Sequence, residues 1–123
     1  MTWNIVSDSS CDLPMNSFTK MCIRDRSCDY PNFGAAAARA VAEGKCQRGI
    51  VICTTGIGIS IAANKIKGIR CAHCADCLEA EMTRRHNDAN MLAIGAGFTG
   101  KNMAERMVEV FLSTEFELSL IHI

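Results

Sequence analysis

The sequence predicts an α/β fold, a Rossmann-like parallel sheet with helices on both faces and an N-terminal truncation. Strand-like and helix-like segments alternate along residues 30–113, an order typical of a parallel sheet with crossover helices. Residues 50–53 are continuously apolar up to a cysteine, as expected for a strand covered on both faces. A glycine-rich loop and a helix-like stretch follow directly, which is the strand, loop and helix order of a ligand-binding edge.

Composition narrows the class of protein. The chain has 123 residues, 49% of them hydrophobic, which suffices for one globular core. The 13 basic and 13 acidic residues give a net charge of zero, so no basic field indicates nucleic acid or an anionic membrane. Apolar runs are too short to cross a bilayer, and residues 1–10 lack the features of a signal peptide. We therefore expect a cytoplasmic protein whose 8 cysteines are free thiols.

The N-terminal half contains one clear helix and one clear strand. In order, the sequence predicts a short strand at 4–7, a turn-rich segment at 8–14, no regular element at 15–29, an alanine-rich helix at 31–43 and a strand at 48–53. Gly44 ends the helix, since glycine readily adopts the left-handed conformation after a last turn. We predict that residues 4–7 pair with 50–53 and act as a first strand.

The C-terminal half continues the alternation. The predicted elements are a helix at 60–67, a strand at 69–75, a helix at 77–86, a strand at 90–95 and a helix that begins at Thr99 or Gly100 and runs to 113. Gly68 ends the first of these helices, and Asp76 is the expected N-cap of the second. The last helix has apolar residues at helical spacing, namely Met103, Met107, Val110 and Phe111.

The loop after the central strand carries the chemistry. Cys53-Thr54-Thr55-Gly56-Ile57-Gly58-Ile59-Ser60 places a thiol, hydroxyls and backbone N–H groups at the carboxyl end of a strand, where open α/β sheets bind ligands. Glycines let the backbone approach a ligand, and the N-terminus of the next helix favours negative charge. A base and an oxyanion-binding loop therefore lie close together. Taken alone, Cys53 fits a small buried hydrophobe more simply, and a Gly-x-Gly loop often marks only a tight turn.

A second cysteine pattern, Cys71-x-x-Cys74-x-x-Cys77, has the spacing of the first ligands of a bacterial iron–sulfur site. Glu81 stands where the fourth cysteine belongs. On a strand, Cys71 and Cys74 point to opposite faces, and His73 shares only the face of Cys71. We therefore predict no metal and no cofactor, and interpret the thiols as partly buried side chains. A thiol metal or redox module is the alternative.

Several pieces of the sequence occur together in a known order and spacing: Asp29-Tyr30-Pro31, Ile52-Cys53-Thr54-Thr55-Gly56-Ile57-Gly58-Ile59-Ser60-Ile61-Ala62-Ala63-Asn64-Lys65, Arg84-Arg85-His86-Asn87-Asp88-Ala89-Asn90 and Phe111-Leu112-Ser113-Thr114-Glu115-Phe116-Glu117. Through them residues 28–117 resemble the type B ribose-5-phosphate isomerases, a family that includes the galactose-6-phosphate isomerase subunits. The combination is far more specific than any single glycine-rich loop.

The resemblance implies an aldose–ketose isomerase that interconverts ribose 5-phosphate and ribulose 5-phosphate through an enediolate. It implies that Cys53 is the base, and that Thr55 and the backbone N–H groups of 56–60 stabilise the negative enediolate oxygen. His86 is implied as the acid/base that opens the sugar ring, since imidazole titrates near neutrality. The other implied substrate contacts are Tyr30, Thr54, Gly56, Ile57, Gly58, Ser60, Asn87 and Asp8. The family's site lies between two subunits, so a homodimer is also implied.

The ends of the chain depart from the family. Two segments match what a transposon end used to fragment DNA libraries encodes, one for each DNA strand. They are Met21-Cys22-Ile23-Arg24-Asp25-Arg26 and Leu118-Ser119-Leu120-Ile121-His122-Ile123. We therefore interpret 1–27 as a foreign or chimeric segment, 28–117 as a partial sugar-phosphate isomerase domain and 118–123 as an artefactual tail. The run from Ser7 to Pro14 resembles the start of DegV-type fatty-acid-binding proteins.

These departures affect the substrate site. The family's first strand ends in Asp-His, whereas Ser7-Asp8-Ser9 stands here, so Asp8 matches the aspartate and no histidine follows it. The basic tail that would hold the phosphate is replaced by 118–123, and each lost charge-assisted hydrogen bond is worth about 1.5–3 kcal/mol. The alternatives are therefore a galactose-6-phosphate isomerase subunit or a catalytically dead chimeric fragment.

Overall fold

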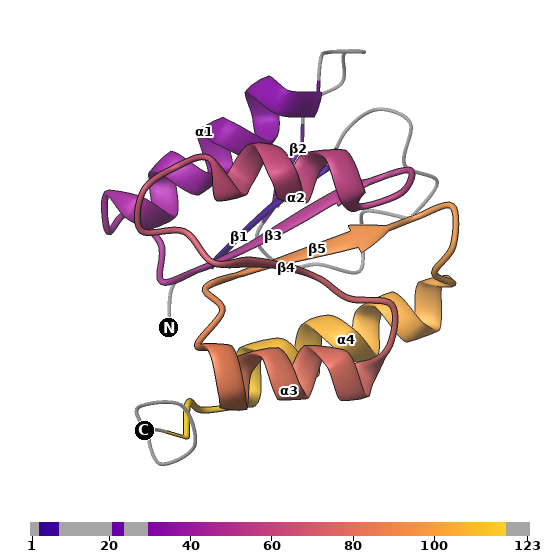
Figure 1. Ribbon diagram of the computed structural model, residues 1–123. Coiled ribbons are helices and arrows are strands. Elements are labelled where there is room, and N and C mark those ends of the chain that lie inside the picture. The colour runs from indigo at the N-terminus through magenta and orange to yellow at the C-terminus, as the bar shows by residue number, and fades with distance from the viewer. Residues whose placement is uncertain (1–2, 8–20, 24–29, 118–123) are drawn as a thin grey trace.

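The computed structural model describes residues 3–7, 21–23 and 30–117, and its strands form a five-stranded sheet in which neighbouring strands are parallel (Figure 1). The strands are β1 (Trp3–Ser7), β2 (Met21–Ile23), β3 (Arg48–Cys53), β4 (Cys71–His73) and β5 (Met91–Gly95). The helices are α1 (Tyr30–Ala42), α2 (Ile57–Asn64), α3 (Cys77–Asn87) and α4 (Lys101–Ser113). The predicted α/β class is confirmed.

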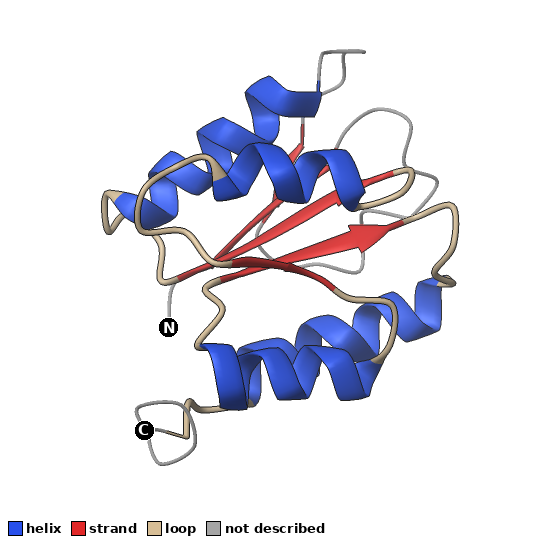
Figure 2. Cartoon of the chain, in the orientation of Figure 1, coloured by secondary structure: helices blue, strands red, loops and turns tan. Residues whose placement is uncertain are grey.

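Helices cover both faces of the sheet, as predicted. α1 and α2 lie together on one face, and α3 and α4 lie together on the other (Figure 1, Figure 2). Along β3 the side chains alternate between the two layers. Ile50 and Ile52 belong to the core against α3 and α4, whereas Val51 and Cys53 belong to the core against α1 and α2. Both faces of this strand are therefore buried, which explains its continuous apolar run.

The strand order is β2-β1-β3-β5-β4. The chain steps from β1 outward to β2 and then crosses to the other side of β1 to form β3. The order therefore reverses between β1 and β3, and open α/β sheets bind ligands beyond the carboxyl ends of the strands at such a switch point. Cys53 ends β3 at this edge of the sheet, which we call the carboxyl edge. The opposite edge is called the amino edge.

The predicted first strand is confirmed. β1 pairs with β3, with Asn4 opposite Gly49 and Ser7 opposite Ile52. The sequence predicts no regular element at 15–29, and the structure corrects this, because β2 lies there, inside a segment that we interpret as transposon-encoded. A strand of 3 residues is too short for a hydrophobic period to appear.

Helix α2 differs from its prediction at both ends. It begins at Ile57 rather than at residue 60, because Gly56 takes the left-handed conformation, with φ 77°, whereas Gly58 already lies within the helix. It ends at Asn64 rather than at residue 67. The N–H of Lys65 bonds to the carbonyl three residues back, a 3₁₀-type bond of the kind that commonly closes the last turn of an α-helix.

The helices predicted at 31–43, at 77–86 and after Gly100 are confirmed as α1, α3 and α4. The carboxylate of Asp76 accepts a hydrogen bond from the N–H of Glu79 at 2.8 Å, so Asp76 caps α3 as predicted. Gly44 follows α1 with φ 80°. In the described part of the chain, no helix has both the length and the apolar character needed to cross a membrane.

Two details of the C-terminal half need correction. β4 is shorter than the predicted strand at 69–75, because the N–H of Arg70 donates to the side chain of Asn90 at 2.9 Å instead of joining the sheet. On α4, Met107 and Phe111 are buried, but Met103 is 43% exposed. The predicted apolar side of α4 is therefore only partly covered within this chain.

Candidate functional site

The candidate site is the loop from Cys53 to Gly58, which we call the thiol loop. Cys53 ends β3 and is 5% exposed. The backbone N–H of Gly56 donates to Cys53 Sγ at an N···S distance of 3.1 Å. Gly56 reaches this position at φ 77°, a conformation that a side chain would strain. The sulfur therefore faces a backbone N–H at the start of α2, where the helix dipole is positive.

The hydroxyls near Cys53 differ in what they contact. Thr55 Oγ1 accepts a hydrogen bond from the N–H of Ile57 at 3.2 Å, and so supports the first turn of α2. The buried hydroxyl of Ser60 donates to the carbonyl of Ile57 at 2.7 Å, within the helix. Thr54 is exposed at the surface of the loop. The structure thus brings Thr54 and Thr55 beside Cys53, while the Ser60 hydroxyl points into α2.

A second glycine loop, Gly95–Gly97, supports the thiol loop. The N–H of Ala96 donates to the carbonyl of Cys53 at 2.8 Å. A Cβ on Gly95 would lie 2.3 Å from the carbonyl oxygen of Thr55, so only glycine allows the two backbones to approach this closely. The role of this loop is not predicted above from the sequence. The available signal is the pair of glycines that directly follows a buried strand.

A histidine considered above only for metal binding lies against the thiol loop. His73 is the last residue of β4 and is exposed. A Cβ on Gly56 would lie 2.7 Å from His73 Cδ2 and 2.9 Å from His73 Nε2. The imidazole therefore packs over Gly56 at the carboxyl edge. Its position near the end of a predicted strand is the signal that could have identified it.

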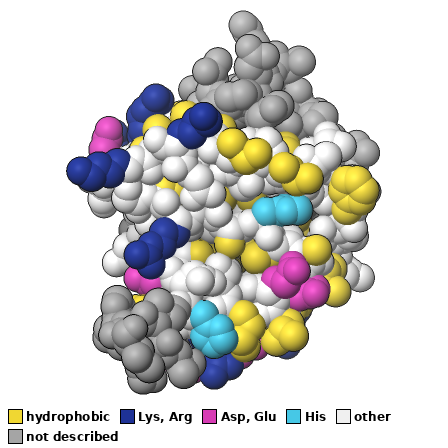
Figure 3. Space-filling view, in the orientation of Figure 1, with side chains coloured by type: hydrophobic (Ala, Val, Ile, Leu, Met, Phe, Trp, Pro, Cys, Tyr) yellow, Lys and Arg dark blue, Asp and Glu magenta, His cyan; other side chains and the backbone are white. Residues whose placement is uncertain are grey.

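His86 and Asn87 lie at the opposite edge of the sheet. α3 begins beyond the carboxyl end of β4 and runs back along the sheet, so its last residues stand at the amino edge (Figure 1). Arg70, just before β4, donates to the carbonyl of Asn87 at 2.8 Å. Figure 3 accordingly shows histidine side chains at two separate places on this face. Within one chain the structure therefore does not bring His86 and Asn87 together with Cys53. We call residues 86–89 the His–Asn turn.

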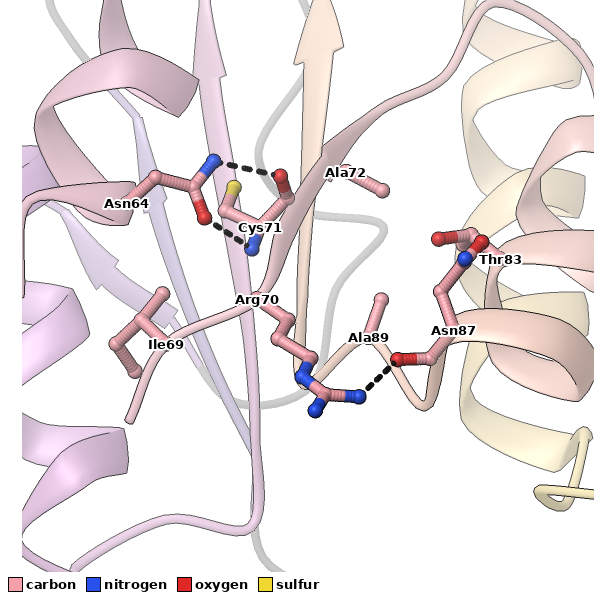
Figure 4. Close-up of a pocket in the computed structure, with 8 residues that line it drawn as sticks. All are labelled: Asn64, Ile69, Arg70, Cys71, Ala72, Thr83, Asn87 and Ala89. Carbon is pink, nitrogen blue, oxygen red and sulfur yellow. Dashed lines mark hydrogen bonds between the residues drawn. The ribbon is translucent and has the colours of Figure 1, made fainter. Parts of the chain in front are cut away.

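A cleft of about 460 Å³ lies at the amino edge between α2, β4 and α3. Figure 4 shows its lining residues, which are Asn64, Ile69, Arg70, Cys71, Ala72, Thr83, Asn87 and Ala89. The Asn64 amide accepts from the N–H of Cys71 and donates to its carbonyl, each at 2.8 Å. These bonds close the free edge of β4. The cleft includes Asn87 but none of the thiol loop.

Two predicted site residues have no described side chain. Asp8 lies outside the described residues, and Tyr30 begins α1 without a described side chain. Their predicted contacts with the sugar phosphate therefore stay predictions of the sequence.

The cysteine pattern is divided between the two faces of the sheet. Cys71 packs against the core on the α1 and α2 side, and Cys74 is buried on the α3 and α4 side, as the alternation of a strand predicts. Burial raises the pKa of both thiols to about 12, so neither is a thiolate near neutral pH. Within residues 3–7, 21–23 and 30–117, no group of three His, Cys, Asp or Glu side chains is placed to hold a metal ion.

Comparison with known proteins finds relatives along most of the chain. The family model described as ribose/galactose isomerase matches residues 11–122. The chain is 45% identical over 89 residues to ribose-5-phosphate isomerase B of Escherichia coli, and the alignment covers 72% of this chain and 60% of that protein. It is 42% identical over 88 residues to the galactose-6-phosphate isomerase subunit LacB of Clostridium acetobutylicum, covering 72% of this chain and 51% of that protein.

A solved structure shares the fold. Ribose-5-phosphate isomerase B of Clostridium thermocellum superposes with a TM-score of 0.84 and 42% sequence identity, over 95% of this chain and 87% of that chain. The similarity extends through the sheet and its helices, which confirms the Rossmann-like prediction. By sequence alignment, however, the chain spans only 60% of the length of the Escherichia coli relative.

Proposed function

Because the chain belongs to the ribose/galactose isomerase family, we propose that it is an aldose–ketose isomerase that interconverts ribose 5-phosphate and ribulose 5-phosphate. Turnover by this chain is itself part of the proposal, since the chain spans 60% of its Escherichia coli relative. The observation that carries the proposal is the thiol of Cys53 beside the N–H of Gly56, at 3.1 Å, at the switch point of the sheet.

The proposed base is the thiolate of Cys53. It removes the proton from the carbon next to the sugar carbonyl, and the electron pair of that C–H bond moves toward the carbonyl oxygen to give an enediolate. The proton then returns to the former carbonyl carbon, while the proton of the adjacent hydroxyl moves from one enediolate oxygen to the other, which yields the isomeric sugar. The negative enediolate oxygen needs donors close by. The start of α2 and Thr55 supply them in this proposal, and a single such donor is worth about 3 kcal/mol of the barrier.

The thiol loop supplies the other contacts in this chain. Thr54, Gly56, Ile57 and Gly58 follow Cys53 directly and lie at the carboxyl edge, which supports their proposed contacts with substrate oxygens. The proposed contacts of Ser60, Tyr30 and Asp8 come from the sequence alone. No metal ion or organic cofactor takes part in the proposed reaction.

We propose that a second copy of the chain supplies His86 and Asn87. Within one chain they stand at the amino edge, so a complete site needs another subunit. Exposed apolar side chains occur near the thiol loop, with Ile57 at 52%, Ile61 at 55% and Phe98 at 81% exposure, and Figure 3 shows hydrophobic side chains gathered on this side. Such surfaces mark interaction sites. A homodimer or higher homo-oligomer would cover them and bring in the imidazole that opens the sugar ring.

Two alternatives to ribose 5-phosphate isomerisation are consistent with the same family. Galactose 6-phosphate is the alternative substrate, favoured by the similarity to the LacB subunit. A catalytically dead fragment is the other, favoured by the chain's span of only 60% of the Escherichia coli relative. For the compartment we propose the cytoplasm, because the cysteines with described side chains are free thiols and such thiols persist in reducing conditions.

The test is a ketose-formation assay of the full chain with ribose 5-phosphate and, separately, with galactose 6-phosphate. Cys53→Ala is run beside the matched control Cys46→Ala, whose thiol precedes β3 at the amino edge. We expect the control to keep its turnover and Cys53→Ala to lose roughly 10²–10⁴-fold, the usual contribution of a positioned base. Turnover retained in Cys53→Ala overturns the assigned base. A folded chain without turnover on either sugar supports the dead fragment.

A further inference from the structure

Arg84 is a buried cation that the proposed chemistry does not use. It lies in α3, two residues before His86, and is 1% exposed. Its Nη1 donates to Asp88 Oδ1 at 2.9 Å and to the carbonyl of Ala89 at 2.5 Å. Its Nε donates to the carbonyl of Thr114 at 3.1 Å. The guanidinium therefore has a partner in each of several directions.

Two of these acceptors belong to the His–Asn turn. Asp88 ends α3 in the left-handed conformation, at φ 49°. The N–H of Ala89 bonds back to the carbonyl of Thr83 at 3.2 Å. Arg84 thus holds the side chain of one turn residue and the backbone of the next from the interior of the protein.

The remaining contacts join the turn to α4. Thr114 follows the last residue of α4, and its carbonyl accepts from Arg84 Nε. The guanidinium carbon also lies 5.9 Å from the centre of the Phe111 ring, a distance at which a cation is attracted to an aromatic face. One side chain therefore links the His–Asn turn to a neighbouring helix that is packed into the core.

Stability alone does not account for this arrangement. Removing a guanidinium from water carries a free-energy cost that its partners only offset, and a well-packed apolar side chain is often equally stabilising. The planar fork of donors does something that an apolar side chain cannot do, because it fixes the relative positions of its acceptors. Geometry is therefore the property that Arg84 adds.

We propose that Arg84 is a positioning residue that sets the His–Asn turn so that His86 is presented to the site of a second copy. This inference rests on the proposed function, in which His86 is the acid/base. Arg84 touches no substrate and acts only through the turn. Lysine keeps the charge but lacks the fork, so it is not expected to replace Arg84.

The kinetic test compares Arg84→Lys and Arg84→Met with Arg85→Met. Arg85 is the matched control, because it is the next residue of α3 and pairs with Glu81 and Glu117 but not with the turn. We expect Arg84→Lys to lower kcat at least about tenfold, since small misplacements of a reacting group are costly, with a smaller change in KM. Arg85→Met is expected to stay within about twofold of the parent chain, as exposed ion pairs contribute little.

A double variant separates positioning from general damage. If Arg84 acts through His86, adding Arg84→Lys to the His86→Gln variant lowers kcat by less than about threefold further, because the effects of coupled residues are not additive. The full loss in the His86→Gln background, or an unchanged kcat in folded Arg84→Lys, overturns the proposal.

Histidine ring signals in NMR spectra give a readout that needs no turnover. His86→Gln assigns the His86 signal, and His73 is the internal control at the other edge. We expect Arg84→Lys to shift or broaden the His86 signal and to leave His73 unchanged; an unchanged His86 signal overturns the proposal. A parent chain without turnover counts against the proposed function, yet the NMR comparison still decides the role of Arg84. Urea unfolding is measured in parallel, and failure of both Arg84 variants to fold would assign Arg84 to overall stability instead.

Discussion

The thiol loop and the His–Asn turn each hold a candidate functional group at an edge of the sheet, but they are held by different means. Backbone contacts fix the thiol loop, since Ala96 donates to the carbonyl of Cys53 and Gly95 leaves room for the backbone of Thr55. Side-chain charges fix the His–Asn turn, where the buried Arg84 pairs with Asp88 at 2.9 Å. The thiol loop therefore depends on glycine, which has no side chain, whereas the His–Asn turn depends on charged side chains.

This difference predicts how each region fails. A methyl group added at Gly95, where β5 meets the thiol loop, would clash with the backbone of Thr55, which cannot move aside without disturbing the packing around it. A lost charge in the His–Asn turn leaves the backbone path intact but removes one of several hydrogen bonds. We therefore expect a single added methyl group at the thiol loop to lower the free energy of unfolding strongly, and the loss of one charge at the His–Asn turn to lower it by a smaller amount.

Gly95→Ala is the most severe change that we predict. Its Cβ would lie 2.3 Å from the oxygen and 2.6 Å from the carbon of the Thr55 carbonyl, so the backbone of Thr55 or the end of β5 must shift. Overpacking of this kind costs about 1–3 kcal/mol, and we expect a value near the top of that range. Urea unfolding of the variant measures the loss.

The control for this change is Gly100→Ala. Nothing lies within 4 Å of a Cβ on Gly100, and its φ of −68° suits any residue. Gly100 is also the N-cap of α4, where alanine is less favourable than glycine, so we expect Gly100→Ala to lower the free energy of unfolding by only about 0.5–1 kcal/mol. Equal midpoints for the two variants would show that the thiol loop is not limited by backbone approach.

Asp88→Ala is expected to cost less, about 2 kcal/mol. The change removes a hydrogen bond to a charged group, worth about 1.5–3 kcal/mol, and leaves Arg84 without its carboxylate. It also places alanine at φ 49°, which β-carbon sterics disfavour. Asp88→Asn is the matched variant, because asparagine tolerates this conformation and still accepts a hydrogen bond. Chemical denaturation should rank the alanine variant below the asparagine variant, and the reverse order would contradict the charge-built description of the turn.

Asp76→Ala tests whether the two regions are independent. α3 begins near the carboxyl edge at Asp76, whose carboxylate bonds the N–H of Glu79, and ends at the His–Asn turn. Loss of an N-cap costs about 1 kcal/mol. Hydrogen exchange of the first turn of α3 should rise, while exchange at the His–Asn turn should stay unchanged. A rise at both ends would mean that the helix transmits disorder from one region to the other.

Local patterns predict most of the fold. The strand at 48–53 and the helix after Asp76 follow from short-range rules on burial, capping and alternation. The pairing of residues 4–7 with β3 is also predicted, but it is a long-range contact that these rules do not give. The errors have local causes as well. Gly58 reads as loop although it lies inside α2, and the brief strand β2 shows no period.

The candidate site also has a part that the sequence predicts and a part that it does not. The thiol loop is predictable because its parts are contiguous in a strand, turn and helix. The roles of Gly95 and His73 are not, because they arise from the strand order β3-β5-β4, which brings the ends of later strands beside Gly56. The separation of His86 from Cys53 likewise follows from the direction in which α3 crosses the sheet, and no motif spacing contains that information.

The smallest predicted effect is a pH dependence of the ion pair between Arg85, which precedes the His–Asn turn, and Glu117. Arg85 Nε lies 2.7 Å from Glu117 Oε1, and this hydrogen bond lowers the pKa of the Glu117 carboxyl. A carboxyl with a lowered folded-state pKa stabilises the protein above its unfolded pKa, near 4.3, and that contribution is lost as the pH falls through the folded value. Both side chains are partly exposed, so the effect is small and is weakened by salt. Urea midpoints measured between about pH 6 and about pH 3 should fall slightly less in Glu117→Gln than in the parent chain. Identical profiles would show that the Arg85–Glu117 pair contributes nothing measurable to stability, and would leave the buried Arg84 as the charge on which the comparison with the thiol loop depends.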